Sequence, residues 1–160
     1  MMDERIKKEI TIEQWVRLSK EGICFPVKVR VEGDSMSPLI RNGRDQVMVL
    51  PLWRSPRVGD IVLFASHYQK NAWVLHRVWR MRAGKIQTLG DGRVDPDICM
   101  PLEEVKGLAV RIERGEKLID PNASFWYLLG RIWMTSRLLR KGVRKVKRGA
   151  AKHKIGFFML

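Results

Sequence analysis

The apolar and polar residues follow helical spacing at both ends of the chain and alternate in between. Near the N-terminus, Ile12 and Trp15 lie about one helical turn apart, and the pattern ends at Gly22. Thr11 and Gln14 have the spacing of a capping box, in which each side chain bonds the backbone N–H of the other residue. The pattern therefore predicts a short amphipathic helix near the N-terminus.

From residue 27 onward the pattern changes from helical spacing to alternation. Val27, Val29 and Val31 alternate with Lys28 and Arg30, as is typical of a half-buried strand. Five further segments have strand patterning, and turn-forming pairs such as Asn-Gly and Ala-Gly lie between them. They are residues 46–50, 60–64, 73–79, 85–89 and 108–112. Short strands in succession, without helices between them, predict a mainly β, antiparallel domain.

Helical spacing returns near residue 122. Phe125, Leu128, Leu129, Ile132 and Trp133 fall on one stripe, and the sequence after them is rich in Lys and Arg. The pattern thus divides the chain into an N-terminal helix (1–22), a β domain (23–120) and a basic amphipathic helix with its tail (121–160).

The net charge of +14 is unevenly distributed, because all 17 acidic residues lie at or before Asp120. A helix with an apolar stripe and a basic excess is typical of a segment that lies on an anionic membrane surface. We expect Trp126, Arg131, Trp133 and Arg137 to make that contact, and we expect no specific nucleic-acid partner. The alternative is a helix that packs against the β domain and leaves only the distal basic residues in solvent.

Several classes of protein are disfavoured by the sequence. The longest run without a charged residue, residues 121–130, is much shorter than the about 18 residues that a membrane span needs. The first residues lack the apolar segment of a secretory signal, so we expect a cytoplasmic or peripherally membrane-associated protein. Cys24 and Cys99 have no metal-binding spacing. They are interpreted as reduced, buried thiols, and no metal or cofactor is expected.

A turn after the first strand carries a candidate nucleophile. Gly33 and Asp34 form a tight turn that presents Ser35, with backbone N–H groups close to its Oγ. An exposed serine next to such donors is what acyl transfer requires of a nucleophile and its oxyanion site. The alternative is a Gly-Asp-Ser loop without chemistry.

His76 and a later carboxylate-rich loop supply candidates for a base and its partner. His76 lies within a strand, where it is either a general base or a buried core histidine. Asp91, Asp95 and Asp97 follow on a loop that is rich in glycine. A carboxylate can orient an imidazole and stabilise its charged form, although such a loop can also be a simple solvated turn.

Four segments, in this order, resemble the successive conserved boxes of the type I signal peptidases. They are residues 33–38 (Gly-Asp-Ser-Met-Ser-Pro), 59–64 (Gly-Asp-Ile-Val-Leu-Phe), 76–78 (His-Arg-Val) and 90–97, which opens with Gly-Asp. The resemblance covers about residues 27–119. It implies the signal-peptidase β fold and a serine endopeptidase that cleaves a leader or signal segment from a precursor peptide or protein.

The same resemblance implies a role for each candidate residue. Ser35 is similar to the family's nucleophile. His76 stands where bacterial-type members have a lysine base, and this choice is similar to the endoplasmic-reticulum, archaeal and spore-former type. Asp97 fits the supporting carboxylate best and Asp95 is the second choice, while Asp91 is expected to shape the loop.

Gly33, Asp34 and Met36 correspond to the family's oxyanion and substrate loop, with two departures from its pattern. The position of Gly33 often holds a serine that assists the oxyanion hole, and Leu39 stands where a threonine is usual. The family's hydrophobic anchor is not found in this sequence. A true signal peptide and the leader of a precursor made in the cytoplasm therefore both stay open as substrates.

Two further hypotheses come from other classes of protein. A self-cleaving, repressor-type peptidase shares a similar serine box, but it uses a lysine base and needs a helix-turn-helix unit before the β domain. A non-catalytic protein that binds a membrane or nucleic acid through the basic C-terminal segment also fits the charge. The sequence does not indicate the oligomeric state.

Overall fold

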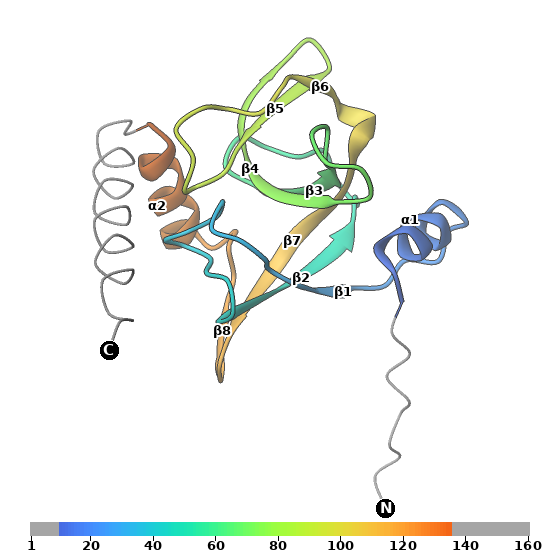
Figure 1. The fold of residues 1–160 in the computed structure, drawn as a ribbon, viewed down its shortest axis with the longest axis horizontal. Helices are drawn as coiled ribbons and strands as arrows, with labels where there is room; N and C mark the ends of the chain where they lie inside the picture. The colour runs from blue at the N-terminus through green and yellow to red at the C-terminus, as the bar shows by residue number, and fades with distance from the viewer. Residues whose placement is uncertain (1–9, 136–160) are drawn as a thin grey trace, which may run out of the picture.

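One antiparallel sheet of eight strands forms the body of the molecule (Figure 1). The structure is a computed structural model and describes residues 10–135. Its elements are α1 (Ile12–Lys20), β1 (Val27–Arg30), β2 (Asp45–Pro51), β3 (Ile61–Ala65), β4 (Trp73–Arg82), β5 (Lys85–Leu89), β6 (Met100–Pro101), a 3-10 turn (Leu102–Glu104), β7 (Val105–Arg114), β8 (Lys117–Ile119) and α2 (Ser124–Thr135). The strand order is β1-β2-β7-β3-β4-β5-β6, with β8 paired to β7.

The prediction of a mainly β, antiparallel fold between two helices is confirmed, and all six predicted strand segments are strands. The sequence did not predict β6 and β8, because strands of two and three residues are too short to show a period. Within residues 10–135, no helix is long and apolar enough to cross a membrane.

The helix α1 lies at one end of the sheet and is held there by Trp15. The predicted capping box is present, with Thr11 Oγ1 accepting from the Gln14 backbone and Gln14 Oε1 accepting from the Thr11 backbone. Trp15 is fully buried, and its Nε1 donates to the Phe25 carbonyl over 2.8 Å. Gly107 of β7 lies beside this indole, where a Cβ would approach the ring to 2.8 Å. Helix and sheet therefore share one hydrophobic core.

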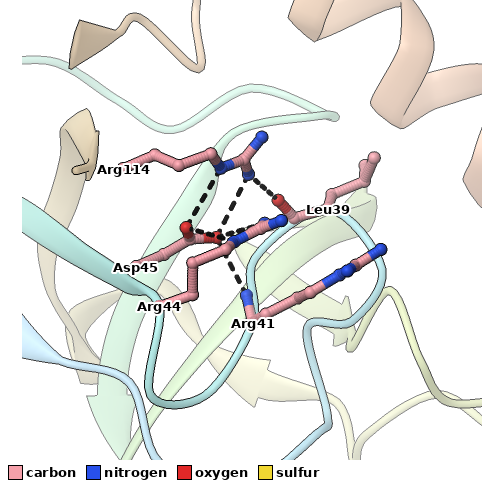
Figure 2. Close-up of polar contacts among 5 residues, drawn as sticks. All are labelled: Leu39, Arg41, Arg44, Asp45 and Arg114. Carbon is pink, nitrogen blue, oxygen red and sulfur yellow. Dashed lines mark hydrogen bonds and ion pairs between the residues drawn. The ribbon is translucent and has the colours of Figure 1, made fainter. Parts of the chain in front are cut away.

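The carboxylate of Asp45 ties the loop that follows the serine turn to the sheet (Figure 2). It accepts hydrogen bonds from the Arg41 backbone at 3.0 Å and from two guanidinium groups. Arg44 donates to both oxygens at 2.7 Å, and Arg114 of β7 donates at 3.0 and 3.1 Å. Arg114 also donates to the Leu39 carbonyl at 2.7 Å. These bonds fix residues 39–45 on the β2–β7 pair.

Stability in acid is expected to depend on Asp45. Burial alone would raise the pKa of this carboxyl, but its bonds to Arg44, Arg114 and the Arg41 backbone hold the pKa well below the ordinary 3.8. A carboxyl with a lowered pKa stabilises the fold above its ordinary pKa and loses that effect as the pH falls. We expect Asp45→Asn to lower the free energy of unfolding by about 1–3 kcal/mol at pH 7.

Urea denaturation at a series of pH values tests this expectation. The difference between the wild type and Asp45→Asn should be full at neutral pH and shrink below pH 3.8. A neutral-pH stability equal to that of the wild type would show that the carboxylate does not hold the loop.

Candidate active site

The candidate residues from separate parts of the sequence line one cleft of about 310 Å³. Ser35, His76 and Asp97 all contribute to its wall. Apolar side chains from three strands complete much of the surface, namely Val29, Leu63 and Leu75. The fold thus brings the predicted nucleophile, base and supporting carboxylate to one concave surface, as a binding or catalytic site requires.

His76 and Asp97 form a buried pair. His76 Nδ1 lies 2.6 Å from Asp97 Oδ2, and the two residues are 3% and 8% exposed. The Thr88 hydroxyl donates to the same oxygen at 2.7 Å, and Gln87 Nε2 donates to the Asp97 carbonyl at 2.9 Å. A carboxylate at Nδ1 favours the tautomer with the proton there, which leaves Nε2 as the nitrogen that can accept a proton.

The surroundings of Asp97 keep its carboxyl ionised. Burial alone would raise its pKa, but the hydrogen bond and charge of His76 and the hydrogen bond from Thr88 bring the pKa below its ordinary value. Asp95, the second predicted carboxylate, is exposed and lies on a separate hollow shared with Asp34 and Ser35. Of the two carboxylates that the sequence left open, the structure brings Asp97 to the imidazole.

The turn around Ser35 is held by its neighbours on both sides. Gly33 has φ +74°, a left-handed conformation that glycine adopts without strain. The Ser37 backbone N–H donates to the Asp34 carbonyl at 3.1 Å, and the side chain of Met36 is buried in the core. With Met36 anchored and Asp34 exposed, Ser35 is presented half-buried at the edge of the cleft.

Two glycines of the carboxylate-rich loop pack against this turn. The Gly92 N–H donates to the Ser35 carbonyl at 2.7 Å. A Cβ on Gly90 would lie 2.5 Å from the Ser35 carbonyl oxygen and 2.9 Å from His76 Nε2. The Nε2 nitrogen and the Ser35 backbone therefore converge on Gly90, and only a residue without a side chain fits between them.

A second buried pair lies behind the first. Arg77 donates to both Asp91 oxygens, at 3.0 and 2.9 Å, and to the Gly59 carbonyl at 2.9 Å. Arg77 is 3% exposed and Asp91 is fully buried. The sequence predicted that Asp91 shapes its loop, but it did not predict the pairing of Asp91 with Arg77. The sequence indicates this pairing only indirectly, because Arg77 directly follows His76 and Asp91 directly follows Gly90.

The C-terminal helix turns its tryptophans toward the domain. Trp126 packs against the core and under Arg114, whose guanidinium carbon lies 5.9 Å from the ring centre. Trp133 Nε1 donates to the Asp91 carbonyl at 2.6 Å. Arg131 is exposed, and Arg137 lies outside the described residues. The apolar face that α2 exposes is instead formed by Phe125, Leu128 and Ile132.

No metal-binding cluster is found in the described part of the chain. Residues 10–135 contain no group of three or more His, Cys, Asp or Glu side chains that could hold a metal ion. Cys24 and Cys99 are free thiols, but the prediction that they are buried is wrong, because both lie on exposed loops.

Comparison with known proteins adds no assignment. Neither a protein-family model nor a curated protein matches this chain. The interpretation of the site therefore depends on its own residues and geometry.

Removing the Asp91 charge is expected to destabilise the fold strongly. Asp91→Asn leaves the buried guanidinium of Arg77 without a full counter-charge, which typically costs about 3–5 kcal/mol of unfolding free energy. Asp95→Asn, on the same loop but exposed, is the matched control and should change stability by less than about 0.5 kcal/mol. Urea denaturation at pH 7 measures both, and equal stabilities would contradict the role given to the pair.

Proposed function

We propose that the protein is a serine endopeptidase of the signal-peptidase type, with Ser35 as nucleophile, His76 as general base and Asp97 as the group that orients the base. The observation that carries the proposal is the 2.6 Å His76–Asp97 bond at the wall of a cleft that Ser35 also lines. The remaining ring nitrogen of His76 faces Gly90, beside the Ser35 backbone. A carboxylate at one ring nitrogen of the base and a serine on the same cleft are two of the relations that serine peptidases require, and they support the proposal.

In the first step, Ser35 Oγ attacks the carbonyl carbon of the scissile bond while its proton passes to His76 Nε2. Asp97 stabilises the imidazolium that forms. Because Gly33 has no hydroxyl to offer, the oxyanion depends on backbone N–H groups of the Ser35 turn. His76 then gives the proton to the leaving amine nitrogen, and the C–N bond breaks to leave an acyl-serine.

In the second step, water loses a proton to His76 Nε2 and attacks the acyl carbon. Collapse of the new tetrahedral intermediate releases the carboxylic acid, and the proton returns to Ser35 Oγ. The same imidazole thus acts twice as base and twice as acid, and no cofactor takes part.

The substrate that the cleft suits is an extended peptide segment. β1 is the first strand of the sheet and pairs with β2, so within residues 10–135 its other edge has no strand partner and could accept an added strand. Val29 and Arg30 of β1, and residues 31–32 that follow the strand, line the cleft. We therefore propose a leader or signal segment as substrate, bound in extended form along β1.

The most direct chemical test is labelling with a fluorophosphonate, which phosphonylates activated serines. We expect rapid labelling of the wild type and none of Ser35→Ala. His76→Ala and Asp97→Asn should react more slowly by about 10³-fold or more, because they lose the base or its orientation. Ser55→Ala, which removes an exposed hydroxyl outside the cleft, is the control and should react like the wild type. Undiminished labelling of Ser35→Ala would refute the assignment.

We further propose that the protein is located in the cytoplasm or at the periphery of an anionic membrane. In the second case the outer face of α2 contacts the lipid. Phe125, Leu128 and Ile132 are each more than half exposed and recur at helical spacing. Arg131 is exposed beside them, and the sequence from Arg131 onward contains ten basic residues and no acidic ones. This charge complements anionic headgroups, which favours a lipid surface over an apolar protein partner.

Co-sedimentation with vesicles tests this surface. The wild type should bind vesicles of phosphatidylglycerol and phosphatidylcholine, bind less as salt rises, and not bind phosphatidylcholine alone. The double variant Phe125→Ser/Ile132→Ser should bind several-fold less. Ile23→Ser/Met81→Ser also removes two exposed apolar side chains, from other surfaces, and should bind like the wild type. Equal binding by the two double variants, or self-association without lipid, would refute the lipid surface.

A further inference from the structure

The inner face of α2 reaches the loop that packs against the Ser35 turn. Trp133 Nε1 donates to the Asp91 carbonyl at 2.6 Å. One turn earlier, the α2 backbone passes close to the Arg77 guanidinium, because a Cβ on Gly130 would lie 2.6 Å from it. Tyr127 donates its hydroxyl proton to the Val58 carbonyl, next to the glycine that also binds Arg77. The helix thus covers the buried Arg77–Asp91 pair.

The bond from Trp133 acts on the same peptide group that holds Ser35. The Asp91 carbonyl and the Gly92 N–H belong to one planar peptide unit. Trp133 donates to the oxygen of this peptide unit, and the Gly92 N–H of the same unit donates to the Ser35 carbonyl at 2.7 Å. Because the unit is planar, fixing the direction of its carbonyl also fixes the direction of its N–H. Hydrogen bonds at the two ends of one peptide unit also polarise and strengthen each other.

We propose that Trp133 is a positioning residue for the reaction, acting through the Asp91–Gly92 peptide on Ser35 and on the adjoining His76. The inference rests on the proposed function, since positioning matters only if Ser35 and His76 react. α2 lies far along the chain from the Ser35 turn, and none of its described side chains lines the cleft. The residues that hold the Ser35 turn in place therefore include one on the C-terminal helix.

Two substitutions on the same helix separate positioning from stability. Trp133→Phe keeps an aromatic ring and removes the N–H donor. Trp126→Phe is the matched control, because Trp126 packs on the core and Arg114 rather than on the Asp91 loop. Trp133→His restores an N–H donor on a ring at a similar distance from the backbone and serves as the rescue.

Amide hydrogen exchange of Gly92, followed by NMR, reports the positioning without relying on activity. We expect the Gly92 N–H to exchange about tenfold or more faster in Trp133→Phe than in the wild type, and Trp126→Phe to leave it unchanged. The fluorophosphonate rate constant should fall about tenfold in Trp133→Phe, at a temperature where all variants are folded, and recover in part in Trp133→His.

The outcomes distinguish the two proposals. If wild-type protein does not react with the probe, the proposed function fails, while the Gly92 exchange data still test the geometric link. If the wild type reacts and Trp133→Phe matches it in rate and in Gly92 exchange, the positioning role is overturned. If Trp133→Phe does not fold, Trp133→His decides the question. A wild-type fluorophosphonate rate and wild-type Gly92 exchange in Trp133→His support the role of the N–H bond. A rate that is tenfold lower together with exchange that is tenfold faster overturns it.

Discussion

The buried ion pair between Arg77 and Asp91 is the interaction on which the arrangement of the site depends. Arg77 is the strand residue next to His76, and Asp91 lies between Gly90 and Gly92. The guanidinium of Arg77 donates to both carboxylate oxygens of Asp91. One further bond, to the Gly59 carbonyl, joins the loop before β3. Two charges taken out of water stabilise a fold only if each satisfies the other, so the position of the loop relative to the strand is narrowly determined. The positions of Gly90 and Gly92, which pack against Ser35, therefore depend on this ion pair.

Much of the fold follows from local patterns in the sequence. Alternation predicted the six main strands, and Thr11 with Gln14 predicted the start of α1, because both signals lie within a few residues. The two shortest strands carry no period, and the exposure of Cys24 and Cys99 depends on loops whose surroundings no local pattern reveals. In α2 the spacing predicted the helix. Which side faces inward was decided by Trp126 and Trp133 finding partners on the domain.

The candidate site was predictable as a set of residues but not as a geometry. The order of the boxes pointed to Ser35, His76 and two possible carboxylates. The family spacing ranked Asp97 ahead of Asp95, but it could not show the contact itself, because that contact depends on how Thr88 and Gln87 of β5 hold Asp97 beside the imidazole. The link from Trp133 to Ser35 crosses three segments and one peptide plane, so it becomes visible only when the chain is folded.

The central claim is that His76 and Asp97 activate Ser35, and the site of covalent modification tests it most directly. After reaction with a fluorophosphonate at neutral pH and trypsin digestion, tandem mass spectrometry of the peptide spanning residues 31–41 locates the adduct. This peptide contains both Ser35 and Ser37, so neighbouring serines are compared within one molecule. The account predicts phosphonylation of Ser35 alone. An adduct on Ser37 or on a serine elsewhere, with Ser35 unmodified, would contradict it.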